Sequence, residues 1–130
     1  MNRERLLRRS LWAAAVANLG GAVLFGFPDS ALGQLAGLPA AVPPLYRAMT
    51  AAFVLLFGGA YAWLAAQPRI NRPFVAFGAI GKTAAFLTVT ALSLAGAAAA
   101  RSVAVLSADL VLAALFVWGL AGTRGDGGRG

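Results

Sequence analysis

Four long apolar segments, separated by short polar or proline-rich breaks, dominate this sequence. They cover residues 11–27, 45–66, 74–100 and 102–122, so each is 17 to 27 residues long. A helix that crosses the roughly 30 Å hydrocarbon core of a membrane needs about 20 residues. The segments are rich in alanine and leucine and lack the period-two alternation of a strand. The sequence therefore predicts an all-α, up-down-up-down bundle of four transmembrane helices.

Charged residues are too few for an ordinary water-facing surface. They make up 12% of the 130 residues, whereas soluble domains carry about 25%. The chain has no histidine and no cysteine, and its only acidic residues are Glu4, Asp29, Asp109 and Asp126. The commonest metal ligand and the usual general base are thus missing. We expect no catalytic residue, no metal and no cofactor, and the composition leans against an enzyme.

The first break, residues 28–44, contains four prolines and is expected to form an outer loop. Within it, Asp29 or Ser30 is expected to cap a short interfacial helix that ends near Leu38. Proline is well accepted in the first turn of a helix, so Pro44 can open the second membrane helix.

The other breaks complete the predicted layout. Residues 1–10 form a basic N-terminus, residues 67–73 a tight polar turn, and Arg101 marks the last turn. The Gly-rich residues 123–130 are predicted to be a disordered tail, which leaves 11–122 as the membrane domain. A basic start before an apolar run also fits a cleaved signal peptide, and this alternative stays open.

The net charge of +7 comes mainly from arginines at the margins of the apolar segments. They do not follow a polar helix face, so we expect no nucleic-acid partner. With four spans, eight arginines fall on one side and only Arg47 and Arg101 on the other, and basic excess marks the cytoplasmic side. Both termini are therefore expected on the cytoplasmic side of a bacterial inner membrane, against anionic headgroups. The eight arginines are Arg3, Arg5, Arg8, Arg9, Arg69, Arg72, Arg124 and Arg129.

Several short motifs resemble those of a known family. The first helix ends at FGFPDSALGQLAGLP, the second opens with PPLYRA, and the third contains GAIGK. Together with the basic start, this layout is similar to the small four-helix bacterial membrane proteins grouped as DoxX-like, over residues 11–120. The resemblance implies a compact bundle and, for parts of that family, a link to membrane redox complexes. It transfers no catalytic residue.

The stretch GAIGKT, residues 78–83, ends like a phosphate-binding loop. That motif requires a glycine five positions before the second one, where this chain has Ala76. It also needs free backbone N–H groups, which a helix inside a bilayer does not offer. We therefore expect uninterrupted helix here and no nucleotide.

Lys82 then needs another explanation, because a cation near a helix centre is costly in a membrane. Gly78 and Ala85 lie one turn away on its face, and small residues let another helix approach. Asn18 and Tyr61 fall at a similar depth on two other helices, and both carry oxygens that accept hydrogen bonds. We expect an interior polar cluster of Asn18, Tyr61 and Lys82, a candidate ligand site. The alternative is an amine that snorkels to the headgroups.

Asp109 is the only acidic residue within an apolar segment. Counted from a turn at Arg101, it lies about 16 Å along the helix axis from Lys82 if both helices are regular, too far for a pair. Arg47 begins the second helix on the same outer side. It shares a face with Thr50, Ala51, Val54, Gly58 and Tyr61 that is expected to point inward. We therefore expect an outer-side ion pair between Arg47 and Asp109.

These features favour a small membrane protein that binds another molecule. The first hypothesis is an accessory protein that holds a lipid-like or quinone-like molecule, or a partner membrane protein. The second is an oligomeric transporter or channel subunit that uses Lys82 and Asp109. The third is a membrane enzyme of the DoxX-like redox type. The sequence leaves the ligand and the oligomeric state open.

Overall fold

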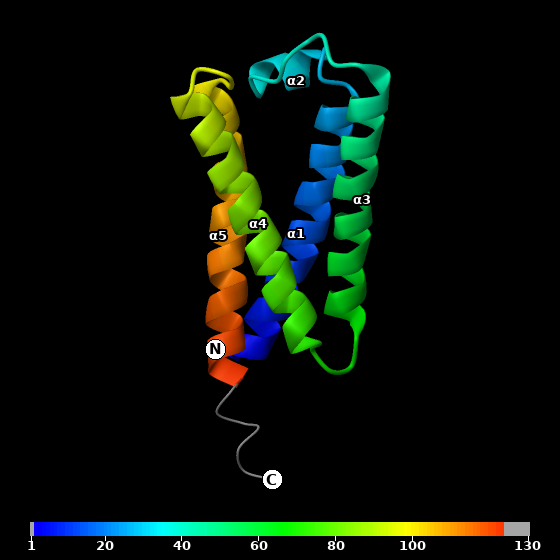
Figure 1. Ribbon diagram of the computed structural model, residues 1–130. Coiled ribbons are helices and arrows are strands. Elements are labelled where there is room, and N and C mark those ends of the chain that lie inside the picture. The colour runs from blue at the N-terminus through cyan, green and yellow to red at the C-terminus, as the bar shows by residue number, and fades with distance from the viewer. Residues whose placement is uncertain (1, 124–130) are drawn as a thin grey trace.

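The computed structural model describes residues 2–123, which form five helices (Figure 1). The tail predicted at 123–130 lies, apart from Thr123, outside the described residues. Four helices are long and one, α2, is short. Their bounds are α1 Arg3–Gly26, α2 Ala31–Leu35, α3 Pro44–Ala66, α4 Arg72–Leu94 and α5 Ala100–Thr123.

The bundle of four transmembrane helices predicted from the sequence is wrong. Among the described residues, three helices are long and apolar enough to cross a membrane: α3, α4 and α5. The apolar part of α1 covers only residues 11–26, because the arginines expected to precede the helix form its first two turns. That part is shorter than the roughly 20 residues a span requires. The three apolar helices indicate a membrane protein.

Local sequence signals explain where the helices begin and end. The Ser30 side chain caps α2 by accepting from Gly33 N at 3.2 Å, which confirms the cap and the short helix expected there, although the helix ends at Leu35 and not near Leu38. Pro44 opens α3. Helix α4 ends at Leu94 because Gly96 adopts a positive φ of 79°. Ala97 N then bonds to Leu92 O at 2.8 Å, the pattern of a Schellman motif.

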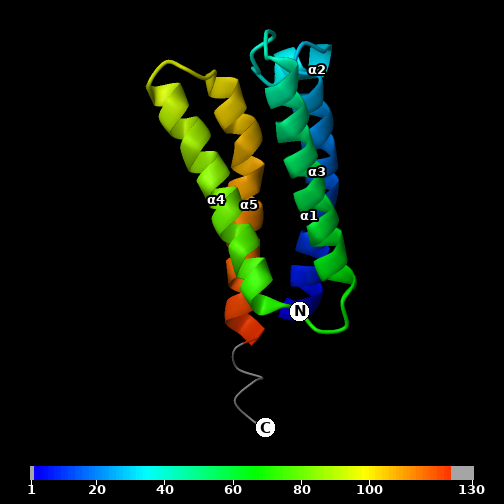
Figure 2. The ribbon, with the colours of Figure 1, turned by 45° about the vertical axis from the view of Figure 1, so that its right-hand side comes forward.

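The long helices form two antiparallel pairs, α1 with α3 and α4 with α5. Helix α1 also packs on α5, so it lies between α3 and α5. Figures 1 and 2 show that the pairs are close at the end that carries the N-terminus and the α3–α4 connection, and diverge towards α2. This is an open arrangement. It differs from a closed bundle because α3 and α4 make few contacts with each other.

The core lies in the half of the molecule where the two pairs meet. Leu7, Leu11, Val75 and Phe116 have no exposed surface. They come from the first half of α1, the start of α4 and the last third of α5. Other buried side chains surround them: Ala14, Tyr61, Leu64, Ala65, Ala79, Leu112 and Ala113.

Arg8 ties α1 to the end of α3 beside this core. Its guanidinium donates to the carbonyl oxygens of Ala65, at 2.9 Å, and of Gln67 and Pro68. It also pairs with the Glu4 carboxylate at 2.9 Å. The last carbonyls of a helix have no partner within it, so Arg8 acts as a cap for α3 from a neighbouring helix.

Apolar side chains also cover the outside of the molecule. In the most apolar 18 residues of each of α3, α4 and α5, only 22% is buried inside the molecule. Large exposed side chains include Phe53, Leu56, Trp63, Ile80 and Val111. A contiguous apolar exterior is the surface expected of helices that contact lipid.

Candidate functional site

Lys82 lies at the middle of α4, as the eleventh of its 23 residues. Its side chain is 4% exposed. The ammonium Nζ donates to Asp109 Oδ1 at 2.7 Å and to Asn18 Oδ1 at 3.2 Å. A snorkelling lysine would extend towards the headgroups, whereas this one is held between α1 and α5. The continuous helix over GAIGKT is also confirmed, and it contains no phosphate loop.

Asn18 is fixed in place by α3. Its amide Nδ2 donates to Val54 O at 3.0 Å, which orients Oδ1 towards Lys82. Gly58 makes this contact possible, since a Cβ atom there would lie 3.0 Å from Asn18 Cβ and 3.4 Å from Ala15 O. Small residues thus let α1 and α3 approach closely at the depth of the lysine.

Tyr61 contacts Lys82 through its ring. The ammonium lies 5.0 Å from the ring centroid, a cation–π distance. The sequence predicts that the phenolic oxygen accepts a hydrogen bond from the ammonium. The structure describes both residues, and no such hydrogen bond forms between them. Gly78 leaves space for the ring, because a Cβ there would approach Tyr61 Cε1 to 2.9 Å. The Tyr61 ring also packs on Phe116, with centroids 5.7 Å apart.

Asp109 pairs with Lys82, so the expectation from the sequence that the two lie too far apart is wrong. The axial offset of about 16 Å assumed that the third helix runs to Ala100. In the structure α4 ends at Leu94 and α5 begins at Ala100. Lys82 is then twelve residues before the end of α4, and Asp109 nine residues after the start of α5. A difference of three residues is only about 4.5 Å.

The predicted pair of Arg47 and Asp109 is therefore not found. Arg47 starts α3, whereas Asp109 lies on α5, and α1 packs between these helices. The face predicted to point inward from Arg47 is buried only near its far end, at Gly58 and Tyr61. Thr50 on the same face is exposed. The two helix pairs diverge at the Arg47 end (Figure 1), and there this face packs on α1. A Cβ atom built at Gly26 would lie 3.5 Å from Ala51 Cβ, and one built at Gly21 would lie 3.3 Å from Val54 Cγ1.

Three helices thus supply one polar site: Asn18 from α1, Lys82 from α4 and Asp109 from α5, with the Tyr61 ring of α3 beside them. The lysine side is closed and the aspartate side is more open, because the Asp109 side chain is 21% exposed. Within residues 2–123, no group of three or more metal-ligating side chains gathers at this site or elsewhere.

Comparisons with known proteins add no relative. No family model matches the chain, and no curated protein or solved structure is significantly similar to it. The DoxX-like resemblance and any function drawn from it stay predictions.

Proposed function

We propose that this chain is a membrane-embedded binding protein that holds a lipid-like or quinone-like molecule by its polar end. The observation that carries the proposal is the Lys82–Asp109 ion pair at mid-length of two apolar helices. Ionisable side chains in membrane segments are costly and usually serve a function.

The contacts of the pair define what the polar end must offer. Two of the three ammonium donors of Lys82 already reach Asp109 and Asn18, and the Tyr61 ring covers the ammonium at 5.0 Å. A carboxylate accepts several hydrogen bonds, and Asp109 is 21% exposed. The incoming group should therefore donate, as a quinol or lipid hydroxyl does. The resemblance to DoxX-like proteins favours the quinol, since parts of that family are linked to redox complexes.

Removing the pair should abolish binding without unfolding the protein. We expect an organic extract of wild-type protein, purified in mild detergent, to contain one hydroxyl-bearing apolar molecule in stoichiometric amount. The double variant Lys82→Met with Asp109→Leu should lose it, while the exposed change Ser107→Ala on α5 should retain it. Mass spectrometry of the extracts measures this. Equal retention by the double variant would remove the site from the proposal, and an empty wild type would remove the binding role.

A transport role is the second candidate. It is favoured by the same position of the ion pair, because charged residues at mid-membrane often mark an ion or proton path. The few helices of one chain would require an oligomer to enclose such a path. A symmetric oligomer without a bound organic molecule, seen by native mass spectrometry, would favour transport. A second, unlike chain that co-purifies would favour an accessory protein for a membrane partner.

We also infer that the arginine-rich end faces the cytoplasm of a bacterial inner membrane, with α1 held along α3 by packing although its own apolar part is shorter than a span. Both ends of the described chain and the α3–α4 connection lie at this end (Figure 1). It carries Arg3, Arg5, Arg8, Arg9, Arg69 and Arg72, whereas Arg47 and Arg101 begin helices at the other end. Basic residues concentrate on the cytoplasmic side and attract anionic headgroups there.

The absence of cysteine from the sequence permits a clean test of orientation. Single cysteines at Ala40, between α2 and α3, and at Pro68, between α3 and α4, occupy exposed positions at opposite ends. In spheroplasts, a membrane-impermeant maleimide should label Ala40→Cys and spare Pro68→Cys. Both should react after permeabilisation. Labelling of Pro68→Cys in intact spheroplasts would reverse the orientation.

A further inference from the structure

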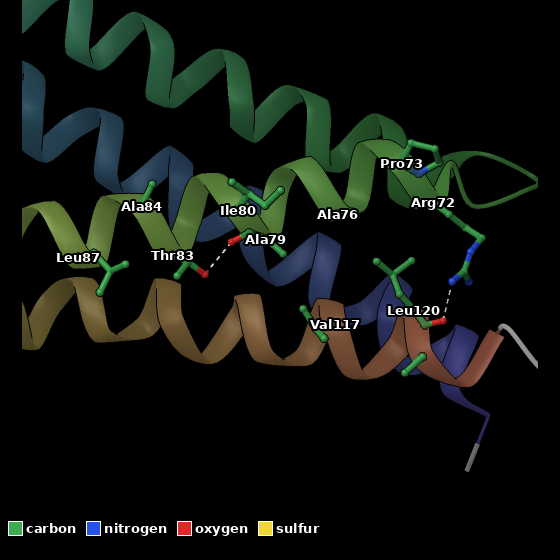
Figure 3. Close-up of a pocket in the computed structure, with 11 residues that line it drawn as sticks. Arg72, Pro73, Ala76, Ala79, Ile80, Thr83, Ala84, Leu87, Val117 and Leu120 are labelled. Carbon is green, nitrogen blue, oxygen red and sulfur yellow. Dashed lines mark hydrogen bonds between the residues drawn. The ribbon is translucent and has the colours of Figure 1, made fainter.

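A groove between α4 and α5 forms a second site, separate from the Lys82–Asp109 pair. It has a volume of about 750 Å³ and runs along α4 from Arg72 to Leu87 (Figure 3). Its walls are apolar, from Ala76, Ile80 and Ala84 on one side and Val117 on the other. Thr83 also lines it, but its hydroxyl donates to Ala79 O at 2.8 Å. The groove therefore offers no hydrogen bond along most of its length.

Arg72 stands at one end of this groove. Its Nη2 donates to Leu120 O at 2.8 Å (Figure 3). Its Nη1 is buried and, among residues 2–123, has no hydrogen-bond partner. Nor does any carboxylate in this part of the chain pair with Arg72: Glu4 binds Arg8, Asp109 binds Lys82, and Asp29 lies between α1 and α2 at the other end. A buried guanidinium donor without a partner is costly, and an anionic oxygen is the acceptor that suits it best.

A second groove of about 540 Å³ adjoins the first and shares Thr83, Val117 and Ala121 with it. Trp118 lines this second groove, and the Arg3 guanidinium lies 4.5 Å from the centroid of its ring. Two adjoining apolar grooves therefore have an arginine nearby, both at the same end of the molecule. This arrangement suits a molecule with two apolar chains and one anionic head.

The position of Arg72 matches the depth of a lipid head group. It is the first residue of α4, a candidate membrane span. From Arg72 to Leu87 the helix rises about 22 Å, which exceeds the roughly 15 Å of hydrocarbon in one leaflet. We propose that the α4–α5 groove binds an anionic phospholipid of the leaflet at the arginine-rich end, with its phosphate on Arg72 and an acyl chain against Ile80 and Leu87.

Two arginine variants test the head group. Delipidated protein in mild detergent is titrated with phosphatidylglycerol and with phosphatidylcholine of identical chains, and native mass spectrometry counts bound lipid. Both lipids carry the phosphate, but the choline ammonium cancels the net charge of phosphatidylcholine. We therefore expect phosphatidylglycerol to bind about tenfold more tightly. Arg72→Gln should remove this preference. Arg69→Gln loses the same charge on the same connection at an exposed position, and should keep the preference.

The groove itself is tested by Ala84→Phe. Ala84 is exposed and lines the groove, so a phenylalanine there fills the space without entering the core. This variant should bind phosphatidylglycerol about tenfold more weakly although Arg72 is intact. Glycerol 3-phosphate should not compete with the lipid. The proposal is overturned if Arg72→Gln and Arg69→Gln behave alike, if Ala84→Phe binds as wild type does, or if oleate binds more tightly than the phospholipid. None of these outcomes bears on a molecule held at Lys82 and Asp109.

Discussion

Replacing Asp109 by leucine alone is expected to destabilise the folded protein strongly, because Lys82 then remains buried without its counter-charge. The lysine side chain is 4% exposed and its Nζ lies 2.7 Å from the carboxylate. Removal of one partner from a buried pair costs on the order of 3–5 kcal/mol. Since Asp109 is itself 21% exposed, we expect a loss of about 3 kcal/mol in the free energy of unfolding. Thermal unfolding in a single detergent measures it.

The double variant with Lys82→Met should recover most of this loss. Methionine and leucine fill similar space with apolar atoms, and exchange of a whole buried ion pair for such residues is often neutral or stabilising. Lys82→Met alone should lose less than Asp109→Leu, because a partly exposed carboxylate finds other hydrogen-bond donors more easily than a buried ammonium finds a counter-charge. A double variant whose loss equals the sum of the two single losses would show that the residues are uncoupled.

The second large effect is expected at Gly58 of α3, which lies against Asn18 of α1 beside the ion pair. A Cβ atom there would lie 3.0 Å from Asn18 Cβ and 3.4 Å from the Ala15 carbonyl oxygen. Gly58→Leu must therefore push the helices apart and pull the Asn18 amide from Lys82. Overpacking of this kind costs about 1–3 kcal/mol, and we expect the upper end of that range because backbone is in the way.

Gly59 provides the matched control for Gly58. It is the next residue of α3, and nothing lies within 4 Å of a Cβ atom built there. Leucine is a better helix former than glycine, so Gly59→Leu should be neutral or stabilise by up to about 1 kcal/mol. Equal melting temperatures for the two variants would contradict the close α1–α3 contact, and with it the positioning of Asn18.

The helices themselves could be located from the sequence with few errors. The apolar segments at 45–66 and 102–122 match α3 and α5 closely. The turn predicted at Arg101 is wrong, because Arg101 is the second residue of α5 and the turn lies at residues 95–99. The start of α1 was misplaced because an arginine-rich stretch can form helix as readily as apolar residues do. This difference changes the number of candidate spans, because the apolar part of α1 alone is too short.

The site was harder to predict, and one glycine explains much of the difficulty. Interpreting Gly96 as the residue that ends α4 would have placed Lys82 and Asp109 at the same depth. Alanines continue past that glycine, so the sequence predicts helix up to Ala100. Asn18, Tyr61 and Lys82 do lie together, because their predicted depths were counted from the arginine-rich ends of the helices and not from the turn before α5. The burial of Arg72 Nη1 depends on packing between α4 and α5, which no pattern in the local sequence predicts.

The pairing of Lys82 with Asp109 inside the membrane helices can be measured directly, because Lys82 is the only lysine in the chain. Protein with ¹⁵N at the lysine Nζ and ¹³C at the aspartate carboxyls, reconstituted in lipid bilayers, gives a single lysine side-chain signal in solid-state NMR. The ion pair at 2.7 Å predicts strong dephasing of this signal by one carboxyl carbon, and its loss in Asp109→Asn made with unlabelled asparagine. A lysine signal that shows no coupling to any aspartate in the wild-type protein would contradict the site.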